Sequence, residues 1–580
     1  MTADPTASRL FKRRSKVHEG AHVHDVKYNP REDTLTDRLV VARGHAPQRE
    51  AIVCFEDEGK RVGRLTYEDL YARAVDVAKG LNARGIRHGD HVVVWLPNSV
   101  EWVVFQHATA MLGAVFVPAN SFYRHAEFEY MLRQSDSVAL IYTPRFLNVD
   151  YEEALRELLP ELAASKRDGF SRFPYLRDVI CVGDSRLPGA LSMDDLIDAG
   201  SAVGEDEILE CAAEVKPSDT LMIMYTSGTT GNPKGCLLSH ANLLENAWHF
   251  SEALELDDSS RYLIPIPFFH NGGCVLGLLS ALQRGSTLIS MDRFVPSLAL
   301  RILADERCTH TGGVPTIYIT MLHDPTLHEL DFSRMKMAFM AGAPCPIKTA
   351  RAVEEALGLT LIIGLGMTET SPLITISRRT DPLDKRVGSV GRPKGCEAKV
   401  IDPVTGEAVG PGVDGELCTR GPNVMQGYYK MPEKTAEVID QDGWLHTGDM
   451  VRRDEDDYYF VTGRLKDLYI VGGENVAPAE VEAFMRTHPA VQDAYLIGVP
   501  DEKYGEVGLA VIQLKPDHRA TETELIDYCR GKLASFKVPR YVQFVPEYPL
   551  TPAGKVKKFV LKDQYVEALG LKSVASEPTA

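Results

Sequence analysis

One run of eleven residues, 225–235, contains side chains and glycines that suit the binding of a polyphosphate. Besides its lysine, Lys234, the run contains hydroxyl side chains and glycines at Thr226, Ser227, Gly228, Thr229, Thr230 and Gly231. Glycines let backbone N–H groups come close to phosphate oxygens, hydroxyls donate hydrogen bonds to them, and a lysine adds a positive charge. A Walker A loop would place glycine directly before the lysine, whereas Pro233 stands there. The run therefore predicts a phosphate-binding loop of another kind, with a flexible Gly/Thr hairpin as the alternative.

Three further stretches place a charged side chain at a turn. Glu369 follows a glycine turn at 364–366 and could be a ligand of Mg²⁺, which binds one or two carboxylates together with phosphate oxygens. Asp449 could accept from two ribose hydroxyls, although an Asx turn explains it equally well. Lys555 follows a glycine and, taken by itself, indicates an exposed basic cluster. His270 alone indicates a core or surface histidine.

Two strands and a helix are predicted to position the loop. The apolar run 221–224 predicts a buried strand that leads into the loop, and 236–238 predicts a strand that leads out of it. Ser239 is the predicted N-cap of a helix that reaches about Phe250. The loop is thus expected to join two strands, with the helix coming afterwards.

The rest of the chain repeats the alternation of strand and helix. This pattern predicts an α/β fold whose large N-terminal domain contains parallel-rich sheets covered by helices. The glycine-rich stretch 380–460 adds a small β-barrel-like or sheet subdomain. A polar break at 463–467 precedes about 110 residues of compact α+β pattern, the size of a small independent domain. The predicted division is a flexible tail at 1–34, a large domain at 35–463, a hinge at 464–466, a small mobile domain at 467–570 and a flexible tail at 571–580.

Composition argues against several classes of protein. The 580 residues carry a formal net charge of −17, which disfavours nucleic acid or an anionic membrane as the main partner. Ten cysteines without a C-x-x-C pair indicate reduced thiols instead of a disulfide framework or a zinc site. No apolar run is long enough for a transmembrane segment, and the basic N-terminus lacks the apolar core of a secretory signal. We therefore expect a cytoplasmic protein.

Taken together, these stretches resemble the adenylate-forming superfamily, which contains acyl-CoA synthetases, adenylation domains of peptide synthetases and beetle-type luciferases. The resemblance covers roughly residues 35–565 and is closest to fatty-acid and crotonobetaine-type ligases. Its blocks follow the family's order, at 225–235, 366–369 (Gly-Met-Thr-Glu), 415–417 (Gly-Glu-Leu), 427–429 (Gly-Tyr-Tyr), 446–449 (His-Thr-Gly-Asp), 463–467 (Gly-Arg-Leu-Lys-Asp), 472–482, 537–539 (Lys-Val-Pro) and 554–555 (Gly-Lys).

The resemblance implies a ligase that binds ATP, CoA and Mg²⁺ and activates a carboxylic acid as its acyl-AMP. In such enzymes the loop at 225–235 would bind the β- and γ-phosphates, Thr368 the α-phosphate and Glu369 the Mg²⁺. Asp449 would bind the ribose, with Arg464 nearby. The remaining nucleotide contacts implied by the resemblance are Gly342, Ala343, Pro344, Gly364, Leu365, Gly366 and Met367. Leu365 departs from the family's pattern, because many members have a tyrosine there that stacks on adenine.

The resemblance also implies a small domain that rotates between the two half-reactions. Lys555 would bridge the substrate carboxylate and the α-phosphate, Lys466 would be the hinge, and Gly472 and Gly473 would line the tunnel for CoA. The acyl pocket would be formed by His270, Asn271, Gly272, Val275, Gly313 and Met340. This wall is mostly apolar, which favours a medium- or long-chain fatty acid or an alicyclic or aromatic acid, and hence a role in fatty acid metabolism.

Three other functions and one assembly remain open at this point. The enzyme could pass its acyl-AMP to a separate carrier protein, or be a luciferase-like oxygenase. A nucleotide-binding scaffold without turnover would be expected to lack Lys555 or Glu369, and both are present. A homodimer is compatible with the sequence.

Overall fold

The computed structural model describes residues 33–164, 169–226, 233–342, 347–471, 474–476, 478–501, 504–530, 532–533, 535–550 and 556–571. The chain divides into two compact units. One unit comprises residues up to Glu397 together with 420–443, and the other comprises 398–419 and all residues from Trp444 onward. We call them the large unit and the small unit.

A seven-stranded sheet in the large unit carries the phosphate loop. Its order is β20-β10-β9-β4-β3-β5-β8, and β9, β4, β3, β5 and β8 run parallel. The strands are β3 (His91–Trp95), β4 (Val115–Pro118), β5 (Ala139–Tyr142), β8 (Asp178–Cys181), β9 (Thr220–Thr226), β10 (Lys234–Ser239) and β20 (Gly427–Tyr428). Nearby helices are α3 (Tyr67–Ala83), α4 (Val100–Met111), α5 (His125–Gln134), α6 (Tyr151–Leu158), α7 (Met193–Ala199) and α8 (Glu205–Glu214).

Aromatic stacking fixes α5 and α6 against this sheet. The ring of Trp95 on β3 lies 3.7 Å from that of Phe128 on α5 and 3.8 Å from that of Tyr151 on α6, measured between centroids. All three side chains are fully buried. Buried aromatic pairs of this kind contribute large apolar areas, so they orient both helices on one face of the sheet.

A nine-stranded sheet forms the other half of the large unit. Its order is β17-β16-β15-β14-β13-β11-β12-β1-β2, and it is parallel from β15 to β1. The strands are β1 (Glu50–Glu56), β2 (Arg61–Thr66), β11 (Arg261–Ile264), β12 (Thr287–Met291), β13 (His310–Gly313), β14 (Met337–Met340), β15 (Thr360–Leu365), β16 (Thr375–Ile376) and β17 (Arg392–Pro393).

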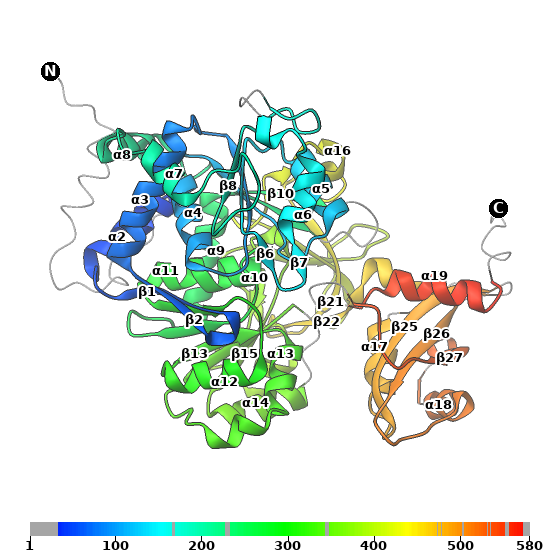
Figure 1. Ribbon diagram of the computed structural model, residues 1–580. Coiled ribbons are helices and arrows are strands. Elements are labelled where there is room, and N and C mark those ends of the chain that lie inside the picture. The colour runs from blue at the N-terminus through cyan, green and yellow to red at the C-terminus, as the bar shows by residue number, and fades with distance from the viewer. Residues whose placement is uncertain are drawn as a thin grey trace. The chain divides into compact units, whose positions relative to one another are not determined.

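Helices cover both faces of the nine-stranded sheet, with α12, α13 and α14 below it and α9 and α11 above it in the view of Figure 1. The helices are α2 (Leu35–His45), α9 (His240–Ala253), α10 (Asn271–Gly273), a π-helical turn (Cys274–Leu279), α11 (Ser280–Arg284), α12 (Pro296–Asp305), α13 (Pro315–Leu322), α14 (Ile347–Leu357), α15 (Leu383–Gly388) and, beside β20, α16 (Pro432–Ala436). The predicted α/β architecture with helix-covered, parallel-rich sheets is therefore confirmed.

The small unit contains two sheets. An antiparallel sheet of order β18-β19-β21-β22 is formed by β18 (Glu397–Ile401), β19 (Asp414–Arg420), β21 (Leu445–Arg453) and β22 (Tyr459–Arg464). The sequence predicts either a small barrel or a sheet for 380–460, and the described strands form a sheet. The second sheet contains β23 (Tyr469–Val471), β24 (Glu474–Val476), β25 (Val491–Asp501), β26 (Gly505–Leu514) and β27 (Tyr541–Phe544), with helices α17 (Pro478–Met485), α18 (Glu522–Cys529) and α19 (Lys558–Ala568).

In the division into two compact units, the four-stranded sheet belongs with the C-terminal residues. The sequence instead predicts this sheet as part of the large domain, which ends at 463 in that prediction. The hinge at 464–466 concerns motion and stays a prediction. The nine cysteines that the structure describes are all free thiols, as expected. Among the described helices, none combines the length and apolar composition that a membrane span requires.

Candidate functional site

A tight antiparallel hairpin brings the two ends of the predicted phosphate loop together. Strands β9 and β10 pair with each other in antiparallel fashion, and Thr226 lies opposite Lys234. The Thr226 hydroxyl lies 3.5 Å from the Lys234 carbonyl oxygen. Ser239 caps α9 by accepting a hydrogen bond from the Asn242 backbone N–H. The predicted strands on both sides of the loop and the helix after them are confirmed, and the helix extends to Ala253.

Several predicted site residues lie outside the described part of the chain. They are Ser227, Gly228, Thr229, Thr230, Gly231, Ala343, Pro344, Gly472, Gly473 and Lys555. Lys466 lies in the described 3₁₀ turn Leu465–Asp467. The roles of all these residues stay predictions.

Tyr428 connects the predicted phosphate lysine to the predicted magnesium ligand. Its strand, β20, pairs with β10, and the ammonium of Lys234 lies 4.3 Å from the centroid of the Tyr428 ring. The Tyr428 hydroxyl donates to Glu369 Oε1 over 2.8 Å. Burial, reinforced by the Glu369 charge, raises the pKa of Tyr428 far above its usual value. Tyr428 therefore stays protonated and acts as a donor to the carboxylate.

Hydrogen bonds hold both the side chain and the backbone of Glu369 in place. It sits on the 3₁₀ turn Thr368–Thr370 that follows β15 and is 6% exposed. Its carbonyl oxygen accepts from the Met425 N–H over 2.9 Å, so the segment containing β20 fixes the whole residue. A carboxylate has about four acceptor positions, and the bond from Tyr428 leaves capacity for a cation.

Two asparagines of α9 tie this helix to the segments that carry Glu369 and Tyr428. The side-chain N–H₂ of Asn246 donates to the carbonyl oxygens of Thr370 and Leu373, and its oxygen accepts from the Leu373 N–H over 3.0 Å. Asn242 donates to the carbonyl oxygens of Pro422 and Val424 over 2.7 and 3.0 Å. Because both side chains are buried, loss of either partner would leave polar groups unsatisfied.

Residues predicted for the acyl pocket and for the nucleotide lie at one edge of the nine-stranded sheet. Gly313, Met340 and Leu365 end the neighbouring parallel strands β13, β14 and β15, and Gly313 pairs with Met340. Gly364 precedes Leu365 in β15, and Gly342 follows β14. Ligands of parallel sheets bind outside the carboxyl ends of the strands, so this placement agrees with the predicted site.

Residues after β11 complete the same edge. The Asn271 side chain donates to the Thr368 hydroxyl over 3.3 Å, which joins the predicted pocket wall to the predicted α-phosphate contact. His270 is exposed, and its Nδ1 accepts from the Gly272 N–H over 3.1 Å. Gly272 and Val275 are buried, whereas Met367 is half-buried.

Gly366 allows the turn that presents Thr368 and Glu369. A Cβ atom at this position would lie 1.5 Å from the carbonyl oxygen of Pro372, which is a backbone atom. We expect Gly366→Ala to lower the free energy of unfolding of the large unit by about 1–3 kcal/mol, the usual cost of overpacking. Denaturant unfolding measures this change. Gly388→Ala is the matched control in the same unit, because a Cβ there meets only the Ile347 side chain, at an ordinary contact distance of 3.5 Å; equal stability of the two variants would contradict the tight turn.

Asp449 and Arg464 face each other on β21 and β22 of the small unit. Arg464 Nε lies 2.6 Å from Asp449 Oδ1, and the carboxylate is 4% exposed while the guanidinium side chain is 39% exposed. The Asp449 N–H donates to the Thr447 hydroxyl over 3.0 Å. The structure thus brings the two predicted ribose-side residues together, and a buried carboxylate beside an accessible guanidinium can accept from hydroxyl groups.

A glutamate–histidine pair orients the turn before Asp449. Glu416 Oε2 lies 3.0 Å from His446 Nδ1, and Glu416 Oε1 accepts from the Gly448 N–H over 2.9 Å. Cys418 Sγ is 3.6 Å from the same histidine nitrogen. These three side chains could group around a metal ion. Since both glutamate oxygens already accept hydrogen bonds, we assign the pair a structural role in shaping the turn.

Sequence reasoning missed Tyr428, Asn242 and Asn246. Tyr428 belongs to a block that carried the family resemblance, but its role depends on a contact across 59 residues. The asparagines are spaced four residues apart, which places them on one face of α9, and that spacing is the signal that could have found them.

Comparison with known proteins agrees with this geometry. Residues 40–429 match the family model described as AMP-binding enzyme, and residues 480–555 match the AMP-binding enzyme C-terminal domain. The chain is 41% identical to the putative acyl-CoA synthetase YngI of Bacillus subtilis, over 91% of this chain and 96% of that protein. It is 37% identical to the mitochondrial medium-chain acyl-CoA ligase ACSF2 of Danio rerio, over 95% of this chain and 91% of that one.

Among solved structures, the chain resembles the anthranilate CoA ligase AuaEII in complex with anthranoyl-AMP. The TM-score is 0.80 at 27% sequence identity, and the match covers 95% of this chain and 100% of that one. A similar fold therefore occurs in an enzyme whose structure contains an acyl-adenylate.

Proposed function

Since the chain belongs to the AMP-binding enzyme family and is an AMP-forming acyl-CoA synthetase, we propose that the acid it activates is an apolar monocarboxylate. Among such acids, we propose medium-chain fatty acids as the best substrates. The observation that carries this proposal is the chemistry of the sheet edge. Val275, Gly313, Met340 and Met367 offer apolar or small surfaces there, and none of the predicted pocket residues is a lysine or arginine. A second carboxylate in the substrate would therefore lack a cationic partner, which disfavours dicarboxylic acids. The name of the ACSF2 relative points the same way.

In the first half-reaction, a carboxylate oxygen of the acid bonds to the α-phosphorus of ATP and the bond to pyrophosphate breaks. Two anions must meet, so the site has to stabilise negative charge that develops in the transition state. We propose that Lys234 and the loop hydroxyls bind the β- and γ-phosphates and that Thr368 contacts the α-phosphate. Lys555 would neutralise the attacking carboxylate and the α-phosphate together, because one compact ammonium can contact both.

The residues at Glu369 fit a magnesium ion. A buried carboxylate with remaining acceptor capacity lies one residue from the Thr368 hydroxyl, and Mg²⁺ prefers oxygen ligands of this kind together with phosphate oxygens. When bound, Mg²⁺ would neutralise charge on the phosphates. We propose Glu369 as its protein ligand.

In the second half-reaction, the thiol of CoA attacks the acyl carbonyl and AMP leaves. We propose that the small domain turns about Lys466 between the two steps, so that Gly472 and Gly473 replace Lys555 at the site and line the path of CoA. Gly342, Ala343 and Pro344 would line adenine, and Leu365 would give it an apolar contact without an aromatic stack. Asp449 and Arg464 would bind the ribose.

Compartment and assembly are further predictions. We propose a cytoplasmic location because the cysteines that the structure describes are free thiols, although the ACSF2 relatives are mitochondrial by name. A homodimer stays a prediction as well.

A panel of acids tests the proposed substrate class. We expect medium-chain fatty acids to give the highest rates of pyrophosphate release, followed by aromatic and longer acids, and we expect AMP release to require CoA. Higher rates with a dicarboxylic acid would contradict the apolar pocket. AMP release that depends on an acyl carrier protein and not on CoA would instead identify an acyl-AMP ligase.

We propose Tyr428 as a positioning residue for Glu369. Tyr428→Phe removes the hydroxyl that Glu369 accepts from but keeps the ring beneath Lys234. We expect the Mg²⁺ concentration for half-maximal pyrophosphate exchange to rise roughly tenfold, because outer hydrogen-bond partners typically change metal affinity or activity by about 10–100-fold. Tyr429→Phe is the matched control, since its hydroxyl bonds Asp136 over 3.0 Å. An unchanged Mg²⁺ requirement in Tyr428→Phe would remove Tyr428 from this role.

A further inference from the structure

The large unit contains a second concave site that the proposed reaction does not use. It is a cavity of about 340 Å³ between the end of α9 and the edge strands β16 and β17. Its charged lining residues are Glu252, Glu255, Arg378, Arg379, Arg392 and Lys394. Four cations against two carboxylates give this lining a net charge of +2, whereas the whole chain carries −17. A local positive site on an acidic protein is the condition for selective binding of an anion.

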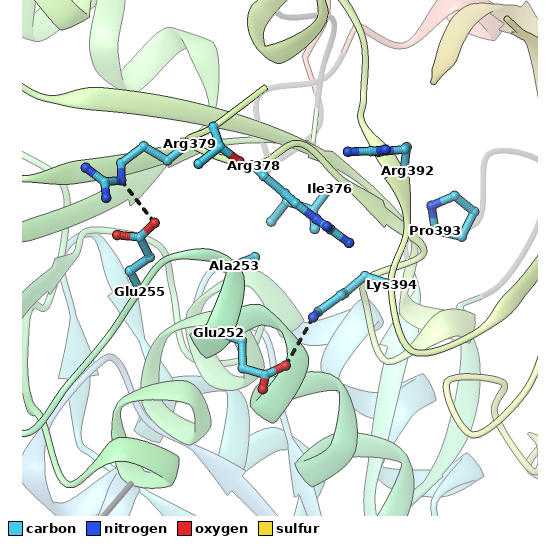
Figure 2. Close-up of a pocket in the computed structure, with 10 residues that line it drawn as sticks. Glu252, Ala253, Glu255, Ile376, Arg378, Arg379, Arg392, Pro393 and Lys394 are labelled. Carbon is cyan, nitrogen blue, oxygen red and sulfur yellow. Dashed lines mark hydrogen bonds and ion pairs between the residues drawn. The ribbon is translucent and has the colours of Figure 1, made fainter. Parts of the chain in front are cut away.

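The cationic groups converge on one hollow. Figure 2 shows the side chains of Arg378, Arg392 and Lys394 turned toward the same space, with Glu252 and Glu255 on the side of α9. Arg392 comes from β17, Lys394 directly follows it, and Arg378 follows β16. Two guanidinium groups and an ammonium from neighbouring chain segments therefore face the same hollow, where their positive charges repel one another.

Ion pairs account for three of the four cations. Lys394 Nζ lies 3.1 Å from Glu252, Arg379 Nε lies 3.0 Å from Glu255, and Arg392 lies 3.1 Å from Asp381. Arg378 differs: within the described residues, its guanidinium has no hydrogen bond or ion pair, and the residue is exposed. Arg378 is thus the cation that an incoming anion can engage without displacing a carboxylate.

The ion pair between Lys394 and Glu252 would open when such an anion binds. The Lys394 and Glu252 side chains are 25% and 39% exposed. Pairs that are this accessible to water contribute little to stability, so a ligand with more than one negative charge can compete with Glu252 for Lys394. The two glutamates on the α9 side at the same time disfavour a long polyanion, because like charges repel.

From these observations we propose that the cavity binds a small phosphate-bearing anion. A guanidinium group can donate two parallel hydrogen bonds to two phosphate oxygens, and an ammonium adds a point charge. Arg378, Arg392 and Lys394 together therefore suit a phosphate monoester, inorganic phosphate or pyrophosphate. The volume lies near the lower end of the roughly 300–1,000 Å³ that ligand pockets occupy, which also favours a small ligand.

The cavity is linked to the catalytic turn through the sheet. Arg392 pairs with Ile376 across β17 and β16, and Ile376 pairs with Gly364 on β15. The Lys394 N–H donates to the Ile374 carbonyl oxygen over 3.0 Å, and the Ile374 N–H donates to the Leu365 carbonyl oxygen over 2.9 Å. Since β15 leads into Thr368 and Glu369, an anion held at Arg392 and Lys394 lies two strands from the strand that carries the site.

Calorimetric titration of the full chain tests the proposal. The probes are inorganic phosphate, pyrophosphate and adenosine 3′,5′-bisphosphate, each at physiological ionic strength, where weak surface attraction is screened. We compare the wild type with R378Q and with R301Q, an exposed arginine that does not line the cavity. K234A serves as a third variant that weakens the phosphate loop alone.

We expect at least one probe to bind the wild type, R301Q and K234A alike at this cavity, and to bind R378Q about tenfold more weakly, the effect of losing one hydrogen bond to a charged group. The probe that binds tightest identifies whether the natural anion is inorganic or part of a nucleotide. If no probe binds the wild type in the millimolar range, or if R378Q binds as the wild type does, the proposal is wrong. Loss of the binding of every probe in K234A, with wild-type binding kept in R378Q, would likewise overturn it, because it would place all of the anion binding in the phosphate loop.

Discussion

Replacing Lys555 by alanine is expected to abolish acyl-AMP formation while sparing thioester formation from supplied acyl-adenylate. The proposed lysine cancels charge on the attacking carboxylate and the α-phosphate only in the first half-reaction. Removal of one such electrostatic group typically costs about 10²–10³-fold in rate. Acid-dependent exchange of labelled pyrophosphate into ATP measures the first step, and CoA-dependent AMP release from acyl-adenylate measures the second.

Lys557→Ala is the matched control for this experiment. It removes an equal charge two residues away, from a residue that the structure places just before α19. We expect it to retain both half-reactions. Equal loss of both half-reactions in Lys555→Ala would contradict the role assigned to this lysine, because a residue used only for adenylation cannot slow the transfer to CoA.

Glu369→Gln is expected to lower the rate of pyrophosphate exchange by at least about a hundredfold, since a direct metal ligand should matter no less than the outer partners that change activity by about 10–100-fold. The substitution keeps the shape of the side chain and an oxygen that can accept from Tyr428. It therefore removes the charge that Mg²⁺ requires and leaves the packing around the turn intact. Exchange rates measured over a range of Mg²⁺ concentrations separate loss of metal binding from loss of fold.

Glu437→Gln provides the comparison for Glu369→Gln. Glu437 belongs to the large unit as well, but its carboxylate is exposed and pairs with Lys434 over 2.7 Å. We expect wild-type rates and an unchanged Mg²⁺ requirement. Wild-type activity in Glu369→Gln would show that the buried carboxylate only maintains the turn through Tyr428.

Local sequence patterns predicted the elements that carry the site. The predicted N-cap at Ser239 fixes the start of α9, because its side chain satisfies a backbone N–H group of the first helical turn. The apolar runs on both sides of the phosphate loop became β9 and β10. These features depend on residues close together in the chain, so a single sequence contains them.

Contacts between distant segments could not be predicted in this way. The hydrogen bond from Tyr428 to Glu369 joins residues 59 positions apart, and the hydrogen bond from Asn246 to Leu373 joins residues 127 positions apart. Both depend on the order of strands in the sheets, which periodicity does not reveal. The grouping of 398–419 with the C-terminal residues has the same cause, since it follows from pairing of β19 with β21.

The central claim is that this chain joins an apolar acid to AMP before CoA takes part. The most direct measurement is exchange of labelled pyrophosphate into ATP with a medium-chain fatty acid and Mg²⁺ in the absence of CoA. We expect rapid exchange that depends on the acid and stops in Glu369→Gln. Absence of exchange with every acid tested, in an enzyme that still releases AMP when CoA is added, would contradict a separate acyl-AMP intermediate and with it the proposed roles of the site residues.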